Sequence, residues 1–238
     1  MPAKTAMAVA AETGRLSIIV PTLNEAGTIK MLLTTLQPMR MRGHEVIVAD
    51  GGSADETAGI SLPLADHVID SPRGRARQMQ SGAAIASGDI LWFLHADSHP
   101  PVNSDRIIQD TLQANSRHWG RFDVRFSGNG LRMGIVATGI NLRSRITGIA
   151  TGDQGIFVSR ALFDSISGFP DIPLMEDIAL SKRLKQHSRP VCLHTRLMTS
   201  PRRWQQYGYL RTVLLMWALR LGYFLGIPPA ELARHYAQ

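Results

Sequence analysis

The strongest constraint on the fold is an alternation of short apolar runs and helical stretches in the first 115 residues. The apolar runs cover residues 16–20, 45–49, 67–70 and 90–94, and each is followed by a stretch with helical spacing. Short connections between strands and helices are typical of a parallel sheet with helices on both faces. The sequence therefore predicts an α/β fold with a predominantly parallel central sheet.

Several element boundaries can be predicted in the same way. The first helix should begin at Asn24 or Glu25 and end before Pro38. Later in the chain, the polar and apolar residues of 120–126 alternate, which predicts a half-exposed strand. Residues 128–152 are rich in Gly and Arg and fit either a helix with flexible ends or a mobile loop. A long apolar helix is expected over 205–226.

The run from Ile90 to Asp97 places a carboxylate just after an apolar strand. Right-handed crossovers bring the carboxyl ends of parallel strands to one edge of the sheet, where open α/β sheets bind ligands. Asp50 and Asp97 should share that edge. Asp97 fits a divalent cation that also binds substrate phosphates, or a residue that caps the following turn. Asp50 fits a ribose or base acceptor and an Asx-turn equally well.

Three other groups of residues have both a functional and a structural interpretation. Arg73, Arg75 and Arg77 at a helix start fit an anion site or a solvated basic turn. The carboxylate pair Glu176-Asp177 fits a general base or charges that stabilise a helix start. Arg202 and Arg203 fit a clamp for a leaving diphosphate or a basic surface pair; these alternatives stay open.

The charge is basic, with a net charge of +7 over 238 residues and a pI near 10.2. Ten of the Lys and Arg residues follow position 181, against one acidic residue, Glu231. Nucleic acid, an anionic membrane and an anionic substrate could each explain this excess. No aromatic RNA-binding signature or basic helix-turn-helix is present, so we expect no nucleic-acid partner. The single cysteine excludes an internal disulfide.

The apolar stretch near the C-terminus resembles a membrane span, but two arginines argue against that assignment. Arg211 and Arg220 are nine residues apart and so fall on opposite sides of a helix. An arginine at the centre of a spanning helix costs about 2.5–3.5 kcal/mol. We expect a helix packed on the core or a peripheral anchor on an anionic membrane. The Ala-rich N-terminus is too weakly apolar for a signal peptide.

Five motifs in this order resemble glycosyltransferase family 2, whose members have the GT-A fold. They are Pro21-Thr22-Leu23-Asn24-Glu25, the stretch DGGSADET at 50–57, ASGD at 86–89, FLHAD at 93–97 and Met175-Glu176-Asp177. The strings GRARQM, FLHADSHPP and SPRRW look closer to the bacterial branch of radical-SAM/selenodomain-associated transferase 2. The resemblance runs from about residue 16 to 204.

The resemblance implies a role for each of these positions. Pro21, Thr22, Glu25 and Asp50 would bind the nucleotide, and Asp97 would hold a divalent cation, Mg²⁺ or Mn²⁺. Asp177 would be the general base, with Glu176 and Gln154 near the acceptor. Arg75, Arg202 and Arg203 would stabilise the leaving diphosphate. The chain departs from the family at His95, which replaces the first Asp of DxD, and at Ser200, which replaces the Gln of QxxRW in processive members.

These observations predict an inverting, metal-assisted transferase with a nucleotide-sugar donor. Its acceptor is unknown, and a lipid-linked acceptor would be consistent. The expected architecture is a Rossmann-like three-layer sandwich with a leader at 1–14, a GT-A domain at 15–204 and a helical extension at 205–238. Residues 15–115 would bind the nucleotide and 116–204 the acceptor. We expect a cytoplasmic protein, either free or on the inner face of the membrane. The alternatives are a non-catalytic nucleotide-sugar binder and a nucleotidyltransferase.

Overall fold

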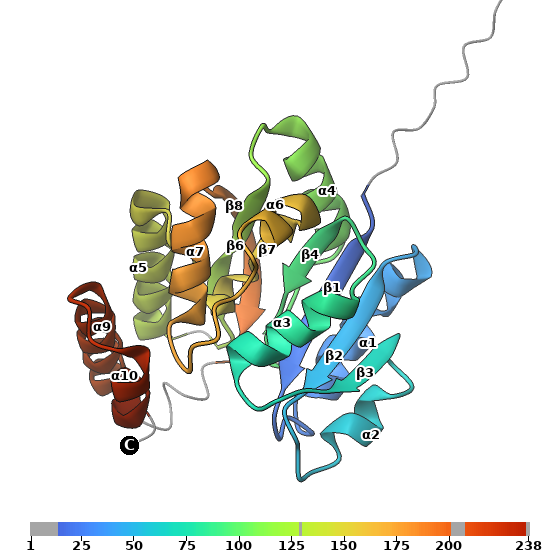
Figure 1. Ribbon diagram of the computed structural model, residues 1–238, viewed down its shortest axis with the longest axis horizontal. Coiled ribbons are helices and arrows are strands. Elements are labelled where there is room, and N and C mark those ends of the chain that lie inside the picture. The colour runs from blue at the N-terminus through green and yellow to red at the C-terminus, as the bar shows by residue number, and fades with distance from the viewer. Residues whose placement is uncertain (1–13, 129, 201–207, 237–238) are drawn as a thin grey trace, which may run out of the picture.

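A computed structural model describes residues 14–128, 130–200 and 208–236. The chain forms one eight-stranded sheet with the strand order β3-β2-β1-β4-β7-β6-β8-β5 (Figure 1). The predicted leader, apart from Gly14, and the pair Arg202 and Arg203 lie outside the described residues.

The first half of the sheet is parallel, as the alternating pattern predicts. Its strands are β1 (Leu16–Thr22), β2 (Glu45–Asp50), β3 (His67–Asp70) and β4 (Ile90–Phe93). The helices that alternate with them are α1 (Ile29–Met41), α2 (Thr57–Ser61), α3 (Arg75–Ile85) and α4 (Ser104–Ala114). The carboxyl ends of β1, β2 and β4 therefore lie at one edge of the sheet.

The second half of the sheet is mixed. It contains β5 (Ser98–His99), β6 (Trp119–Phe126), β7 (Phe157–Ser159) and β8 (Val191–Thr199). β7 runs antiparallel to both β4 and β6, and β5 runs antiparallel to β8, whereas β6 and β8 are parallel. Here the helices are α5 (Leu131–Thr147), the 3₁₀ helix η1 (Gly152–Gln154), α6 (Arg160–Ser165) and α7 (Glu176–His187).

Two hydrophobic clusters make the structure a three-layer sandwich. One cluster packs α1 and α4 on one face of the sheet, for example through Leu32 and Ile108. The other packs α3, α6 and α7 on the opposite face, for example through Met79, Phe163 and Leu180. Figure 1 shows these helices on either side of the strands.

Two helices, α9 (Tyr209–Phe224) and α10 (Pro229–Tyr236), follow the sheet domain and lie beside α5 and α7 in Figure 1. Leu219 and Leu232 pack with Ile178 in a separate cluster, which ties α9 and α10 to α7. No helix in the described ranges is long and apolar enough to cross a membrane.

The structure differs from the expected boundaries at α1. The helix begins at Ile29 because Asn24 has a left-handed backbone (φ 54°) and the Glu25 carbonyl accepts hydrogen bonds from Thr28 and Ile29 in a turn. It continues past Pro38, which is exposed in the last turn, because Met39 is buried in the core. One missing backbone hydrogen bond near a helix end costs less than it would in the interior.

The prediction that 120–126 is half-exposed is also wrong. All residues of β6 are buried except Arg125. Its outward face is covered by α5, through contacts of Val124 and Phe126 with Met133 and Ala137. The buried polar residues of β6 are satisfied by one another and by α5, so an alternating pattern occurs in a strand that is covered on both faces.

Candidate active site

A cavity of about 1040 Å³ lies at the carboxyl edge of the sheet. Its wall combines the end of β1, the start of α3, the segment after β4, the start of α7, and parts of α5 and α9. Of the residues predicted from the sequence, those that line it are Pro21, Thr22, Glu25, Arg73, Arg75, Asp97, Glu176 and Asp177. Asp50 and Gln154 are not part of this wall.

Asp50 builds the turn behind the cavity. Its carboxylate accepts hydrogen bonds from Thr22 Oγ1 (3.0 Å), the Ser53 amide (2.7 Å) and the Gly52 amide (3.1 Å). Burial disfavours its charge, but these hydrogen bonds outweigh burial, so the pKa of Asp50 lies below its usual value. Asp50 therefore holds Thr22 and the turn, and Thr22 reaches the cavity.

Gln78 is a functional-site residue that the sequence analysis missed. Its Nε2 donates to the carbonyls of Thr22 (2.6 Å) and Ala49 (3.0 Å), which ties the ends of β1 and β2 together. The side chain is buried and lines the cavity. A long polar residue on the sheet-facing side of α3 is the signal that could have identified it.

Asp97 follows β4 and lies half-buried in the cavity, where Thr199 Oγ1 from β8 is 3.5 Å from its Oδ1. No group of three or more His, Cys, Asp or Glu side chains in the described part of the chain is arranged to hold a metal ion. Mg²⁺ commonly takes one or two protein carboxylates and completes its shell with water and substrate phosphates. The residues present therefore fit a cation shared with a diphosphate, not one held by the protein alone.

His95 packs against the backbone of Gly152. A Cβ atom at Gly152 would lie 2.4 Å from His95 Nε2, so only glycine fits there. Burial, with a smaller contribution from Arg75, lowers the pKa of His95 to about 3. A neutral imidazole thus occupies the position where the family resemblance places the first carboxylate of DxD.

Glu176 and Asp177 open α7 but have different surroundings. Asp177 accepts hydrogen bonds from the amides of Gly152 (3.0 Å) and Ile178 (2.7 Å), which fix its orientation at the cavity. Glu176 is only 7% exposed. Burial and the neighbouring Asp177 charge raise the pKa of Glu176 to about 7, against the opposing effect of Arg75.

Arg75 connects the two halves of the site. It is the first residue of α3, and its side chain lies in the field of Glu176, Asp177, Asp97 and Tyr236. Arg75 is exposed to the cavity although it lies among many protein atoms, and the resulting desolvation opposes its charge, but these neighbours outweigh that effect and raise the pKa of Arg75. The Arg75 guanidinium therefore lies among carboxylates from the segment after β4 and from the start of α7.

Three further charged residues line the cavity and were not identified from the sequence as site residues. They are Arg143 on α5, Asp153 in η1 and Arg220 on α9. Burial raises the pKa of Asp153, whereas burial and then the charge of Arg220 lower the pKa of Arg143 to about 10. Each of the two arginines follows apolar residues at helical spacing on its own helix. This pattern identifies the arginines as site residues only when the packing of α5 and α9 is known.

Gln154 has a structural role. It is fully buried, its Oε1 accepts a hydrogen bond from the Thr151 amide (3.1 Å), and its Nε2 lies 3.4 Å from Asn141 Oδ1. These contacts fix η1 rather than present Gln154 to a substrate.

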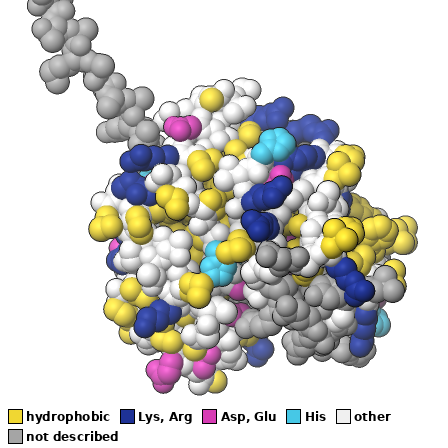
Figure 2. Space-filling view, turned by 180° about the vertical axis from the view of Figure 1, so that it is seen from behind, with side chains coloured by type: hydrophobic (Ala, Val, Ile, Leu, Met, Phe, Trp, Pro, Cys, Tyr) yellow, Lys and Arg dark blue, Asp and Glu magenta, His cyan; other side chains and the backbone are white. Residues whose placement is uncertain are grey.

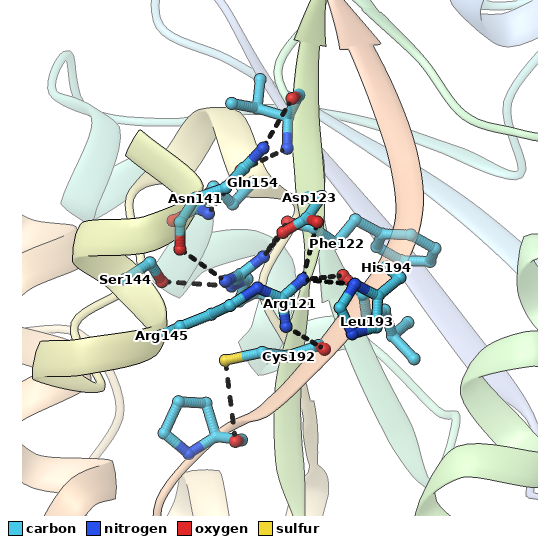
Figure 3. A network of polar contacts seen from close by, with 12 residues as sticks. Arg121, Phe122, Asp123, Asn141, Ser144, Arg145, Gln154, Cys192, Leu193 and His194 are labelled. Carbon is cyan, nitrogen blue, oxygen red and sulfur yellow. Dashed lines mark hydrogen bonds and ion pairs between the residues drawn. The ribbon is translucent and has the colours of Figure 1, made fainter. Parts of the chain in front are cut away.

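Gln154 belongs to a polar network that fixes α5 on β6 (Figure 3). Asp123 forms ion pairs with the fully buried Arg121 and with Arg145, the latter at 2.6 Å. Arg121 Nε also donates to Ser144 Oγ on α5 (3.1 Å). The network therefore sets the position of the helix that carries Arg143.

Comparison with known proteins identifies the family to which the chain is similar. The profile of glycosyl transferase family 2 matches residues 17–158. The PGL/p-HBAD biosynthesis glycosyltransferase of Mycobacterium tuberculosis is 38% identical over 134 residues, which cover 45% of this chain and 52% of that protein. This chain thus spans about half the length of the curated relatives it matches.

Two solved structures share the fold. Staphylococcus aureus TarS 1–349 in complex with UDP-GlcNAc superposes with a TM-score of 0.64 at 19% identity, over 78% of this chain and 58% of that one. Glucosyl-3-phosphoglycerate synthase of M. tuberculosis in complex with Mn²⁺, UDP and phosphoglyceric acid gives a TM-score of 0.58 at 19% identity, over 78% and 69%. The predicted GT-A fold is confirmed, and the chain belongs to glycosyl transferase family 2.

Proposed function

We propose that this protein transfers a sugar from a nucleoside-diphosphate sugar to an acceptor hydroxyl, with inversion at the anomeric carbon. The observation that carries this proposal is that one cavity gathers Asp97, Arg75 and Asp177 from three separate elements. The neighbouring structures with UDP or UDP-GlcNAc support a nucleotide-sugar donor. In this proposal residues 15–115 bind the nucleotide, and residues 116–204 bind the acceptor.

Asp177 is the general base of the proposed reaction. An acceptor hydroxyl is a poor nucleophile near neutral pH, and a positioned base that removes its proton typically contributes about 10²–10⁴-fold to the rate. The amides of Gly152 and Ile178 hold the Asp177 carboxylate in place. In this proposal the acceptor hydroxyl that Asp177 deprotonates displaces the nucleoside diphosphate from the anomeric carbon in one step, and a single displacement inverts that carbon.

The leaving diphosphate lies, in this proposal, between Arg75 and Asp97. The Arg75 guanidinium balances the negative charge that develops on the diphosphate. A divalent cation at Asp97, Mg²⁺ or Mn²⁺, would add Lewis-acid stabilisation of the same charge. Pro21, Thr22 and Glu25 line the side of the cavity next to β1 and are assigned to the nucleotide.

The test is a panel of UDP-, GDP- and dTDP-sugars with Mg²⁺ or Mn²⁺, read out as release of the nucleoside diphosphate. With an active donor, Asp177→Asn should lower kcat by about 10²–10⁴-fold while the donor still binds. Asp97→Asn should weaken metal-dependent donor binding, and EDTA should reproduce that loss in the wild-type protein. Asp110→Asn, an exposed carboxylate on α4, is the matched control.

Three outcomes would contradict the proposal in different ways. If no nucleotide or nucleotide sugar binds, the donor assignment is wrong. If donors bind but no nucleoside diphosphate is released, and Asp177→Asn leaves cellular function unchanged, the chain is a non-catalytic binder. If pyrophosphate is released from a nucleoside triphosphate, it is a nucleotidyltransferase.

We also propose that α9 touches an anionic membrane from its outer face. Leu214, Leu221 and Leu225 lie on one side of α9 and are 58%, 60% and 75% exposed. In Figure 2, several Lys and Arg side chains cluster on one face of the molecule, with Asp and Glu side chains scattered among them. A basic net charge together with exposed apolar side chains is typical of proteins that bind membranes peripherally. The cytoplasmic location and the radical-SAM/selenodomain-associated branch remain predictions from the sequence.

A further inference from the structure

Two arginines reach the cavity from different helices and have no role in the proposed transfer step. Arg143 comes from α5 and Arg220 from α9. In each, the Nε atom is buried and has no hydrogen-bond partner in the part of the chain that the structure describes. Arg143 Nη2 has only a long contact, 3.5 Å, with Thr151 Oγ1. Within the described ranges, neither arginine forms an ion pair with a carboxylate within 4.0 Å.

Holding these two groups together is unfavourable in the free protein. A buried N–H without an acceptor loses its hydrogen bonds to water, and two like charges repel. The charge of Arg220, after burial, is a cause of the lowered pKa of Arg143, and Arg121 acts in the same direction. Asp153 and Asp177 offset this effect only in part. An anion bound between the two guanidiniums would supply the missing acceptors, and the planar fork of arginine matches phosphate and carboxylate oxygens.

The approach to the arginine pair is apolar on both helices. On α5, Val136, Ile140 and Arg143 have the spacing i, i+4, i+7 and share one face. The same holds on α9 for Val213, Met216 and Arg220, at i, i+3, i+7. All six side chains line the cavity. Its α5–α9 wall is therefore apolar at one end and cationic at the other.

The arginine pair lies beside the proposed base. The Asp177 carboxylate accepts a hydrogen bond from the Gly152 amide. Asp153, which follows Gly152 in the chain, lies in the electrostatic field of both Arg143 and Arg220. The nucleotide residues Pro21 and Thr22 come instead from β1. A ligand held by the arginine pair would thus approach Asp177 from the side of α5 and α9.

We propose that Arg143 and Arg220 bind the anionic group, a phosphate or carboxylate, of an amphipathic acceptor. The apolar part of that acceptor lies along Val136, Ile140, Val213 and Met216. The identification of this ligand as the acceptor rests on the proposed function, whereas the binding site itself does not.

Isothermal titration calorimetry with three probes tests the site on the full chain. Octyl phosphate should bind at least tenfold more tightly than octyl glucoside, which has the same chain without the charge. It should also bind at least tenfold more tightly than inorganic phosphate, which has the charge without the chain. Arg143→Gln and Arg220→Gln should each weaken octyl phosphate binding tenfold or more. Arg211→Gln, an exposed arginine on α9, should leave it unchanged.

Each alternative result overturns a defined part of the proposal. No anion site exists if octyl glucoside binds as tightly as octyl phosphate. The same conclusion follows if both arginine variants bind octyl phosphate as tightly as the wild-type protein does. Equal binding of inorganic phosphate would show a site for a small soluble anion instead of an amphipathic ligand. The comparison of probes on the wild-type protein holds even if a variant fails to fold, which circular dichroism would reveal. Binding of UDP with Mn²⁺, measured in parallel, separates this site from the donor site: octyl phosphate binding without UDP binding would refute the proposed function alone.

Discussion

Glu176 makes the stability of the fold depend on pH. Its pKa in the folded protein is about 7, raised from 4.5 by burial and by Asp177. Between these two values the folded protein keeps a proton that the unfolded chain has released. The contribution of Glu176 to the free energy of unfolding therefore falls as the pH rises through this window, and each unit of pKa shift corresponds to about 1.4 kcal/mol.

Glu176→Gln should remove this dependence because glutamine does not ionise. Relative to the variant, the wild-type protein should lose unfolding free energy between pH 4.5 and pH 7, with a slope of at most about 1.4 kcal/mol per pH unit. Urea unfolding of both proteins at several pH values measures the difference. Parallel curves for the two proteins would show that Glu176 is ionised in the fold at the usual pH.

Gly152 is predicted to be essential in the cavity wall. The Cβ atom of Gly152→Ala would lie 2.4 Å from His95 Nε2, so the ring or the η1 backbone must move. Overpacking of this kind costs about 1–3 kcal/mol, and the movement would displace the amide that holds Asp177. We expect lower thermal stability and lower kcat.

Gly134→Ala on α5 is the control, because nothing lies within 4 Å of its Cβ. Alanine favours a helix over glycine by about 0.5–1 kcal/mol, so this variant should be neutral or slightly stabilised. Equal behaviour of the two variants would mean that the contact between Gly152 and His95 is not tight.

For single residues, the sequence predicted which residues belong to the site region better than it predicted what each side chain does there. Asp97, Arg75 and Asp177 reach the cavity as expected, because strand ends and helix starts share one edge of the sheet. Asp50 and Gln154 do not, because their side chains hold local turns. The choice between a turn and a ligand depends on which way a short polar side chain points, and spacing along the chain does not determine that.

Strand β6 shows why element type was easier to predict than burial. Its alternation of polar and apolar residues correctly predicted a strand, but it also predicted that one face of this strand is exposed to solvent. That face is buried because Asp123 forms ion pairs with Arg121 and Arg145, and α5 covers the network (Figure 3). Arg121 and Asp123 are two positions apart on β6, and Arg145 lies on α5. Their ion pairs can be recognised only when the position of α5 against β6 is known.

Asp123→Asn should strongly destabilise the protein. The change removes the carboxylate that pairs with the fully buried Arg121, and leaving a buried charge unpaired typically costs 3–5 kcal/mol. Chemical unfolding of the variant and the wild type measures this loss. Arg125→Gln on the same strand is exposed and should change stability by less than about 0.5 kcal/mol. A small effect of Asp123→Asn would show that β6 tolerates the loss of its ion pairs.

At the scale of the whole molecule, the alternation of strands and helices was sufficient to predict the layered architecture. It did not predict β5, which is two residues long, or the antiparallel direction of β7. Two residues carry no periodic pattern, and the direction of a strand depends on which strands it pairs with. The contribution of α9 to the cavity was also outside sequence reasoning, since Arg220 and Met216 face inward only because α9 packs on α7.

Net charge and exposed apolar side chains together predict that the protein binds anionic vesicles. The net charge is +7, and α9 exposes Leu214 and Leu221 on its outer side. In co-sedimentation, the wild-type protein should bind vesicles that contain phosphatidylglycerol but not neutral phosphatidylcholine vesicles. Salt should weaken the binding, because charge attraction is screened within about 10 Å at 0.1 M ionic strength. The double substitution of Leu214 and Leu221 by Ser should reduce binding, whereas the same double change at Met31 and Met41, which are at least as exposed on α1, should not. Equal binding to neutral vesicles would exclude charge as the attraction, and equal binding of the two double variants would exclude α9 as the contact.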